Sequence, residues 1–419
     1  MYSNDTRELE RQLQKLKENK EFNDIFNSIE TYLNTPNIKK SLEIIYELIK
    51  DNYCHIFQNV DITADSKLNN KKRETLNTKL DNIIFLSKND RKNIKKTMPL
   101  ISEINATYKT NNIKLYIVSK EDEQLEKDVI RRIVSKLFML IDLFTNAQKT
   151  TYNLYVWLSD LKKYKPNSKK TFRSQHINSG ATVHNLLEET VELFIWRKEE
   201  IEKVLLHEMI HTLKLDFMGY PDELKQAIIQ TFNIPSSIDL RLGEAYVETW
   251  AILLNTMYIS FTSKTQCESK SNGFFKFFKL FTMEICFTLY KSSKILSHFG
   301  YGCITGCEVP LIKSKNPNDA THELFEQETS VFSYYLIKGS VLMNLDGFIN
   351  FCCKNNELLL QFVESPENYQ ELHRVFIESA KKNILLNKMT NLNINLDENE
   401  QENELLDNTM RMTLYELKL

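Results

Sequence analysis

The sequence lacks an excess of either charge, because 54 lysines and arginines stand against 56 aspartates and glutamates. A protein that holds a phosphate backbone needs a basic surface, so this balance argues against nucleic acid as a main partner. Cysteines are also few, and 7 is an odd number that does not suit a disulfide-rich scaffold. We therefore expect free thiols and a reducing compartment.

Long apolar runs are missing as well. The N-terminus passes directly into charged helical sequence, without the apolar core of a secretory signal. The most apolar stretch, Phe274 to Tyr290, is interrupted by Lys276, Lys279 and Glu284, which favours a buried amphipathic helix over a membrane span. The sequence thus predicts a cytoplasmic protein with no membrane partner.

Glycine and proline are scarce, at 9 and 8 residues, whereas lysine and asparagine are abundant. This usage suits an AT-rich genome, including those of some large DNA viruses and protists. It bears on origin, and function has to be inferred from motifs.

The first hundred residues are typical of helices. Apolar residues recur at three- and four-residue steps from Leu9 to Leu33, and Thr35-Pro36 can begin a further helix. Residues 62–98 are rich in Lys, Asn and Asp, which predicts a loose helical region or a linker. We therefore assign residues 1–105 to a helical N-terminal cap or interaction region.

Strand patterns begin after this region, at residues 113–118, 152–158, 181–184 and 191–196. From residue 198 onward the pattern is mainly helical. The sequence therefore predicts an α+β fold, with a domain over residues 106–390 that combines a small mixed sheet with a mainly helical subdomain. Residues 391–419 are predicted to form an acidic, mobile C-terminal tail.

The motif that carries chemistry is His207-Glu208-Met209-Ile210-His211. On a helix, the two histidines lie one turn apart and point the same way, as two imidazoles that bind one ion must. Glu208 is then placed to take a proton from a zinc-bound water. The flanking positions are apolar almost all round, so the helix must be buried and its polar groups need a compensating partner such as a metal. The alternative is a core histidine pair satisfied by backbone carbonyls, with Glu208 in a salt bridge.

This motif resembles that of the zincin metallopeptidases, in which a twisted sheet precedes the active-site helix and its edge strand aligns the substrate. The order of strand 191–196 and the motif helix is similar, and the resemblance covers roughly residues 110–260. Lys214 and Phe217 stand where the metzincin branch has Gly and a third ligand. The chain is therefore more similar to the gluzincin branch, which implies a glutamate ligand from a second helix.

Residues 243–250 look like this second-helix element. Their four-residue spacing puts Glu244 and Glu248 on one helix face. The resemblance implies that Glu244 is the third ligand of one Zn²⁺ ion and that Glu248, where the family has Asp, supports a zinc-binding histidine. Reversed roles stay open, and Asp216 is the next candidate for the third ligand.

Three residues are predicted to bind substrate. Arg241 lies one turn before Glu244 on the same helix face, where it could orient a ligand carboxylate or bind the C-terminal carboxylate of a peptide. A plain surface arginine is the alternative. Gly180 and Ala181 stand at the start of the predicted edge strand and are expected to line the substrate cleft.

A hydrolytic zinc site also needs a donor for the oxyanion. Gluzincins commonly use a tyrosine or histidine from the C-terminal subdomain, and residues 328–338 form a helical pattern with two adjacent tyrosines. We assign this role to Tyr334, with Tyr335 and His322 as alternatives.

The resemblance therefore implies a zinc metallopeptidase that hydrolyses a peptide or protein substrate. The alternative is a non-catalytic, zincin-like helical interaction protein with a structural metal site. Zinc-dependent hydrolysis of a non-peptide amide is a third reading. The sequence leaves open the oligomeric state and the choice between endopeptidase and exopeptidase.

Overall fold

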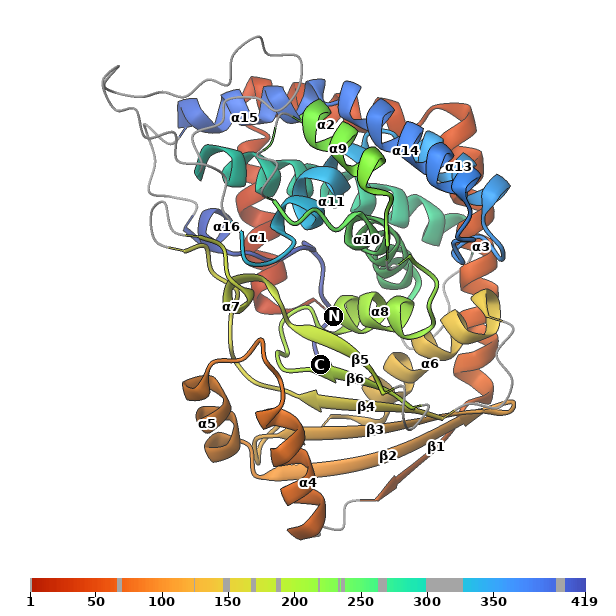
Figure 1. Cartoon of the computed structure of the whole chain (residues 1–419), viewed down its shortest axis with the longest axis vertical. Coiled ribbons are helices and arrows are strands. Elements are labelled where there is room, and N and C mark those ends of the chain that lie inside the picture. Colours follow the sequence, from red (N-terminus) through yellow and green to blue (C-terminus); the bar gives the residue numbers. More distant parts are fainter. Residues whose placement is uncertain are drawn as a thin grey trace.

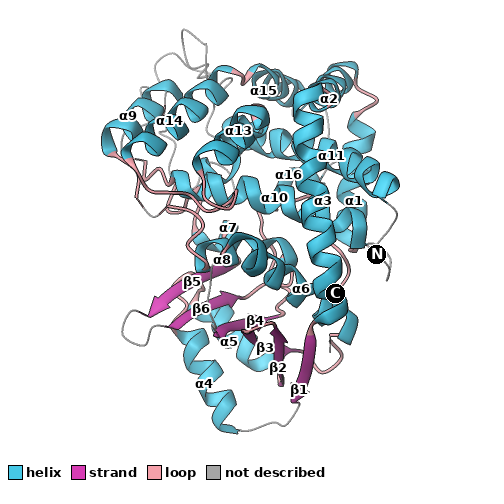
Figure 2. Ribbon diagram, turned by 90° about the vertical axis from the view of Figure 1, so that its right-hand side faces the viewer, coloured by secondary structure: helices cyan, strands magenta, loops and turns pink. Residues whose placement is uncertain are grey.

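A six-stranded sheet and a larger set of helices form the two sides of the protein (Figure 1; Figure 2). The computed structural model describes the chain except for residues 1, 66–69, 124, 146–150, 167–170, 186–189, 218, 233, 235–237, 263–269, 299–326 and 397–403. The strands are β1 (Asp61–Asp65), β2 (Leu100–Tyr108), β3 (Asn111–Ser119), β4 (Thr151–Trp157), β5 (Gly180–Asn185) and β6 (Thr190–Ile195).

The helices divide into those before the sheet is complete and those after it. The first group is α1 (Asn4–Leu16), α2 (Lys20–Leu33), α3 (Pro36–Asn59), α4 (Asn70–Asp81), α5 (Lys88–Thr97), α6 (Lys127–Phe144) and α7 (Ser174–Ile177). The second group is α8 (Ile201–Thr212), α9 (Asp222–Phe232), α10 (Leu242–Thr262), α11 (Lys270–His298), the π-helix η1 (Phe332–Ile337), α12 (Lys338–Leu342), α13 (Leu345–Asn355), α14 (Pro366–Lys381), α15 (Ile384–Leu396) and α16 (Glu404–Asn408).

The sheet has the strand order β1-β2-β3-β4-β6-β5 and is mixed. The pairs β3–β4 and β4–β6 are parallel. The pairs β1–β2, β2–β3 and β5–β6 are antiparallel. Helices α6 and α8 lie on one face and α4 and α5 on the other (Figure 1). Covering both faces explains why the parallel strands are apolar along most of their length. Strand β5 is left at the edge beside α8.

The fold agrees with the predicted α+β class, and each strand predicted from the sequence lies within or next to one of the strands β3 to β6. Two strands were not anticipated, because β1 and β2 lie in the region assigned to an N-terminal helical cap. The boundary predicted at residue 105 falls inside β2. Helices α1 to α3 also bury Leu13, Ile25 and Ile45 in the common core, so this region is built into the same body as the sheet.

The prediction of a mobile C-terminal tail is wrong for residues 404–419. Leu414 and Tyr415 are buried, and their backbone N–H groups donate to the carboxylate of Glu284 at 2.9 and 3.0 Å. Buried backbone groups need partners of this kind, and a buried carboxylate supplies several at once. The acidic residues 397–403 lie outside the described residues.

The apolar stretch in α11 is buried, as the sequence predicts, with Phe281 and Phe287 fully covered. Within the described ranges, no helix is long and apolar enough to cross a membrane. Cys286, Cys352 and Cys353 are free thiols, but Cys54 is disulfide-bonded. The expectation of free thiols throughout is therefore wrong at Cys54, and cysteine usage no longer indicates a reducing compartment.

Candidate metal centre

Helix α8 carries the predicted motif and lies between the sheet and α10 (Figure 1). Leu206 and Ile210 are fully buried, and His207 and Glu208 are only 5% and 7% exposed. A short helix that is apolar almost all round is stable here because it packs on the sheet on one side and on α10 on the other. Its position therefore puts the motif in the interior, at the side of edge strand β5.

Three potential ligand atoms meet at this point, one from each of His207, His211 and Glu244. The Nε2 atoms of the two histidines are 3.2 Å apart, and they lie 3.2 and 3.3 Å from Oε2 of Glu244. Ligands placed about 2.0–2.1 Å from a zinc ion at tetrahedral angles are about 3.3–3.4 Å from one another. The three atoms thus have nearly the spacing of one face of a zinc tetrahedron, and the site fits the ion.

The other ring nitrogen of each histidine faces a carboxylate. Nδ1 of His207 lies 2.8 Å from Oε1 of Glu248, and Nδ1 of His211 lies 2.8 Å from Oδ2 of Asp216. A carboxylate beside Nδ1 favours the proton at that nitrogen, which leaves the lone pair of Nε2 toward the ligand centre. At His211 the contact is a hydrogen bond, whereas at His207 it is an ion-pair contact without hydrogen-bond geometry among the described residues. Glu248 therefore lies behind His207, and Asp216, the alternative candidate for the third ligand, contacts His211.

The carboxylates around the two histidines carry negative charge that a cation would balance. Burial by itself would lower the pKa of both histidines, but the carboxylates of Glu244, Glu248 and Asp216 raise both pKa values above the ordinary one. Burial likewise opposes ionisation of Glu244, yet the two imidazoles hold its pKa well below the usual range. Without a metal, protons on the histidines would supply the positive charge that these carboxylates need.

Two buried lysines neutralise the carboxylate behind His207. Lys203, on α8 itself, forms an ion pair with Glu248, and Nζ of Lys338 lies 3.8 Å from the other oxygen of that carboxylate. Although burial disfavours its charge, these neighbours keep the pKa of Glu248 below its usual range. Burial also lowers the pKa of Lys338 to about 8. A buried carboxylate that stays ionised favours a proton on the facing Nδ1 of His207, from which it lies 2.8 Å away.

This arrangement ranks the carboxylates by their effect on zinc binding. Glu244→Ala is expected to remove zinc, because only two protein donors remain. Glu248→Ala and Asp216→Ala are each expected to weaken binding by about 10- to 100-fold, the usual effect of losing a partner behind a zinc-binding histidine. Competition with a chromophoric chelator measures all three, with the exposed Glu223→Ala as control. A greater loss in Glu248→Ala than in Glu244→Ala would reverse the two roles.

The predicted substrate residues line one cleft of about 480 Å³, which also exposes His207, His211, Glu208 and Glu244. Gly180 and Ala181 form part of its wall on the β5 side. Arg241 lines the cleft too, but its guanidinium binds Asp239 at 2.8 Å rather than a ligand carboxylate. The suggestion that Arg241 orients Glu244 is therefore wrong in this structure, and only its substrate role stays a prediction.

Glu208 projects into the same cleft without contacting the three-atom group as a ligand. Burial raises the pKa of its carboxyl, while the two imidazoles and a hydrogen bond from Thr182 lower it. The hydroxyl of Thr182 lies 3.0 Å from Oε2 of Glu208. A partly desolvated carboxylate with a raised pKa is a better base near neutral pH than an exposed one.

The two adjacent tyrosines point in different directions. Tyr334 lines the cleft, its ring centroid lies 6.0 Å from that of His207, and the carboxylates of Glu244, Glu208 and Glu248 act on its hydroxyl electrostatically. Burial and the nearby carboxylates raise the pKa of Tyr334 well above the usual value, so its hydroxyl stays protonated. Tyr335 instead donates to the backbone oxygen of Met410 at 2.6 Å. Both lie in the π-helix η1, a feature common at functional sites. His322 lies outside the described residues.

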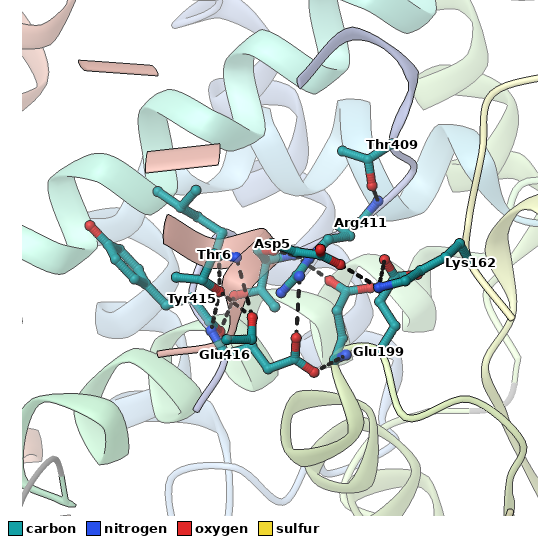
Figure 3. Close-up of polar contacts among 12 residues, drawn as sticks. Asp5, Thr6, Lys162, Glu199, Thr409, Arg411, Tyr415 and Glu416 are labelled. Atoms are coloured by element: carbon teal, nitrogen blue, oxygen red, sulfur yellow. Dashed lines mark hydrogen bonds and ion pairs between the residues drawn. The ribbon is translucent and has the colours of Figure 1, made fainter. Parts of the chain in front are cut away.

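The C-terminal segment, residues 409–416, contacts the residues that lead into α8 (Figure 3). Glu416 accepts a hydrogen bond from the backbone of Glu200 at 2.6 Å, and Glu200 in turn accepts from Met412 and Thr413. Lys162 bridges Glu199 and Asp5 from the N-terminal helix. Residues from both ends of the chain therefore hold helix α8 in place, which no local sequence pattern indicated.

Comparison with known proteins gives one distant likeness. The chain is 25% identical over 232 residues to an uncharacterized protein of Acanthamoeba polyphaga mimivirus, a match that covers 54% of this chain and 56% of that protein. No family model matches the chain, and no solved structure matches it. The relative comes from a giant virus, the type of source that the residue usage indicates. Function must therefore be argued from the geometry of the site.

Proposed function

We propose that this chain is a zinc-dependent peptidase of the zincin type, with His207, His211 and Glu244 as ligands. The observation that carries the proposal is the near-tetrahedral spacing of their three ligand atoms, 3.2 to 3.3 Å apart, at the floor of a cleft. Nδ1 of His211 is hydrogen-bonded to Asp216 and Nδ1 of His207 lies at ion-pair distance from Glu248, which leaves both Nε2 atoms toward the centre. Edge strand β5 beside α8 and a third ligand from a later helix fit the zincin arrangement.

Two further residues supply the chemistry that hydrolysis needs from the protein. A zinc ion, when bound, provides Lewis acidity and makes water easier to deprotonate. Glu208 lies next to the ligand group and takes the proton of the attacking water, which it then delivers to the leaving amine. Tyr334, kept protonated by its surroundings, donates a hydrogen bond to the oxyanion of the substrate carbonyl. The cleft accepts a peptide or protein segment alongside β5.

A complex peptide mixture can test the proposal while the natural substrate is unidentified. Purified protein is dialysed against chelator, reloaded with one equivalent of zinc and incubated with a proteome-derived peptide mixture. Mass spectrometry is expected to show new peptide ends with the zinc-loaded protein and none with the metal-free protein. One bound zinc without new ends would favour the non-catalytic interaction protein with a structural metal, or hydrolysis of a non-peptide amide.

A further inference from the structure

We propose that Gly180 and Thr182 of edge strand β5 are positioning residues for Glu208, and that together they leave Oε1 as the atom that takes the proton. Residues two apart in a strand point to the same face, which here is the face toward α8. The claim that Oε1 takes a proton during hydrolysis rests on the proposed function. The contacts themselves do not depend on it.

Gly180 leaves room for the Glu208 side chain. A Cβ atom added at position 180 would lie 2.7 Å from Cγ and 2.8 Å from Oε1 of Glu208, and 2.8 Å from Cδ1 of Ile195. Carbon atoms do not approach so closely, so any side chain at this position would push the carboxylate away. All three close neighbours are side-chain atoms, of Glu208 and of Ile195. A methyl group at 180 would therefore push on the Glu208 carboxylate and on the Ile195 side chain without a direct clash with backbone.

Thr182 holds the other oxygen of the same carboxylate. Its hydroxyl lies 3.0 Å from Oε2 and 3.0 Å from the backbone oxygen of Glu208, but it has only one proton to donate. That backbone oxygen already accepts the hydroxyl of Thr212 at 2.8 Å. A hydrogen bond to an ionised carboxylate is also the stronger one. We therefore assign the proton of Thr182 to Oε2.

Under this assignment the two carboxylate oxygens of Glu208 have different roles. Oε2 accepts the hydroxyl of Thr182, while Oε1 packs against Gly180 in the cleft wall and accepts no hydrogen bond from the described residues. Glu208 then has a fixed orientation before substrate binds, which removes a cost of ordering it during the reaction. The role needs a small hydroxyl residue at 182 and a residue without a side chain at 180.

The test compares Thr182→Val, Thr182→Ser and Gly180→Ala with the wild type, all zinc-loaded, on a peptide that the wild type cleaves. Valine has the shape of threonine without the hydroxyl, and Thr63→Val on the opposite edge strand β1 is the matched control. Misplacing a catalytic group by about 1 Å can cost about 10²-fold in rate. We expect kcat to fall by about 10- to 100-fold in Thr182→Val and Gly180→Ala, with zinc content unchanged in both and KM unchanged in Thr182→Val. Thr182→Ser is expected to restore most of kcat.

An unchanged kcat in Thr182→Val, or a serine variant as slow as the valine variant, would overturn the positioning role. A crystal structure of zinc-loaded Thr182→Val adds a readout without activity, in which the Glu208 carboxylate should have turned from its wild-type position. If it has not moved, the proposal is wrong even if no peptide is ever cleaved. Absence of hydrolysis by the wild type would count against the proposed function instead.

Discussion

Glu208→Gln is expected to fold, to bind one zinc ion like the wild type, and to hydrolyse peptides about 10²- to 10⁴-fold more slowly. That range is the usual contribution of a positioned general base. Glutamine has nearly the same shape as glutamate and still accepts a hydrogen bond from Thr182 through its amide oxygen. The ligand atoms come from other residues, so zinc binding should be preserved. The substitution thus removes proton transfer alone.

The measurement is kcat on one cleaved peptide together with zinc content by elemental analysis. Glu371→Gln makes the same change at a half-buried position on α14, far from the cleft residues in the sequence, where the carboxylate binds Arg374, and should leave kcat as in the wild type. Hydrolysis by Glu208→Gln at the wild-type rate would show that another group takes the proton. Loss of zinc in this variant would instead make Glu208 part of the ion's binding group.

The parts of the site that could be predicted from the sequence depend on helical spacing. His207 and His211 are four residues apart on α8, and Glu244 and Glu248 are four residues apart on α10, so each pair shares a helix face. The packing of α10 on α8 then brings the two pairs together. A regular period within one element is visible in a single sequence, and it grouped the residues of each pair. The link between the two pairs came from the resemblance to the gluzincin branch.

Asp216 shows why the rest could not be predicted. After α8 the chain reverses through Lys214, whose φ of 55° is left-handed, and the N–H of Leu215 bonds back to the oxygen of Ile210. This turn carries Asp216 back to Nδ1 of His211. Glycine is the usual residue at such a turn, and lysine gives no such signal. The contact between Asp216 and His211 therefore depends on the backbone conformation of Lys214, which the sequence does not indicate.

Contacts between residues far apart in the sequence could not be predicted either. Strand β1 gains its partner only when the chain returns at β2, after α4 and α5. The polar composition of residues 62–98 had suggested a loose helical region or a linker there. The C-terminal segment reaches Glu200 and Glu284 across more than a hundred residues of sequence. Thr182 and Glu208 belong to different elements, so their hydrogen bond follows from the packing of β5 on α8. None of these contacts has a period that a single sequence displays.

His211→Ala is expected to abolish zinc binding at equimolar metal and, with it, all hydrolysis. The substitution leaves His207 and Glu244 as the two protein donors, whereas three hold the ion in a catalytic zinc site. It also leaves Asp216 buried without its imidazole partner. Because zinc binds only the folded site, the wild type should gain about 4 kcal/mol of stability when free zinc is about 1,000 times Kd. His211→Ala should gain none of this.

Thermal unfolding with and without zinc measures the difference, and elemental analysis gives the stoichiometry. His55→Ala is the matched control, because His55 is exposed on α3 and contacts only the ring of Tyr108 among the described aromatic pairs. It should bind one zinc and show the full zinc-dependent shift in Tm. If His211→Ala showed the same shift and the same zinc content as His55→Ala, the ion would have to be held elsewhere. The near-tetrahedral group of His207, His211 and Glu244 would then be a hydrogen-bonded cluster of the core rather than a metal centre.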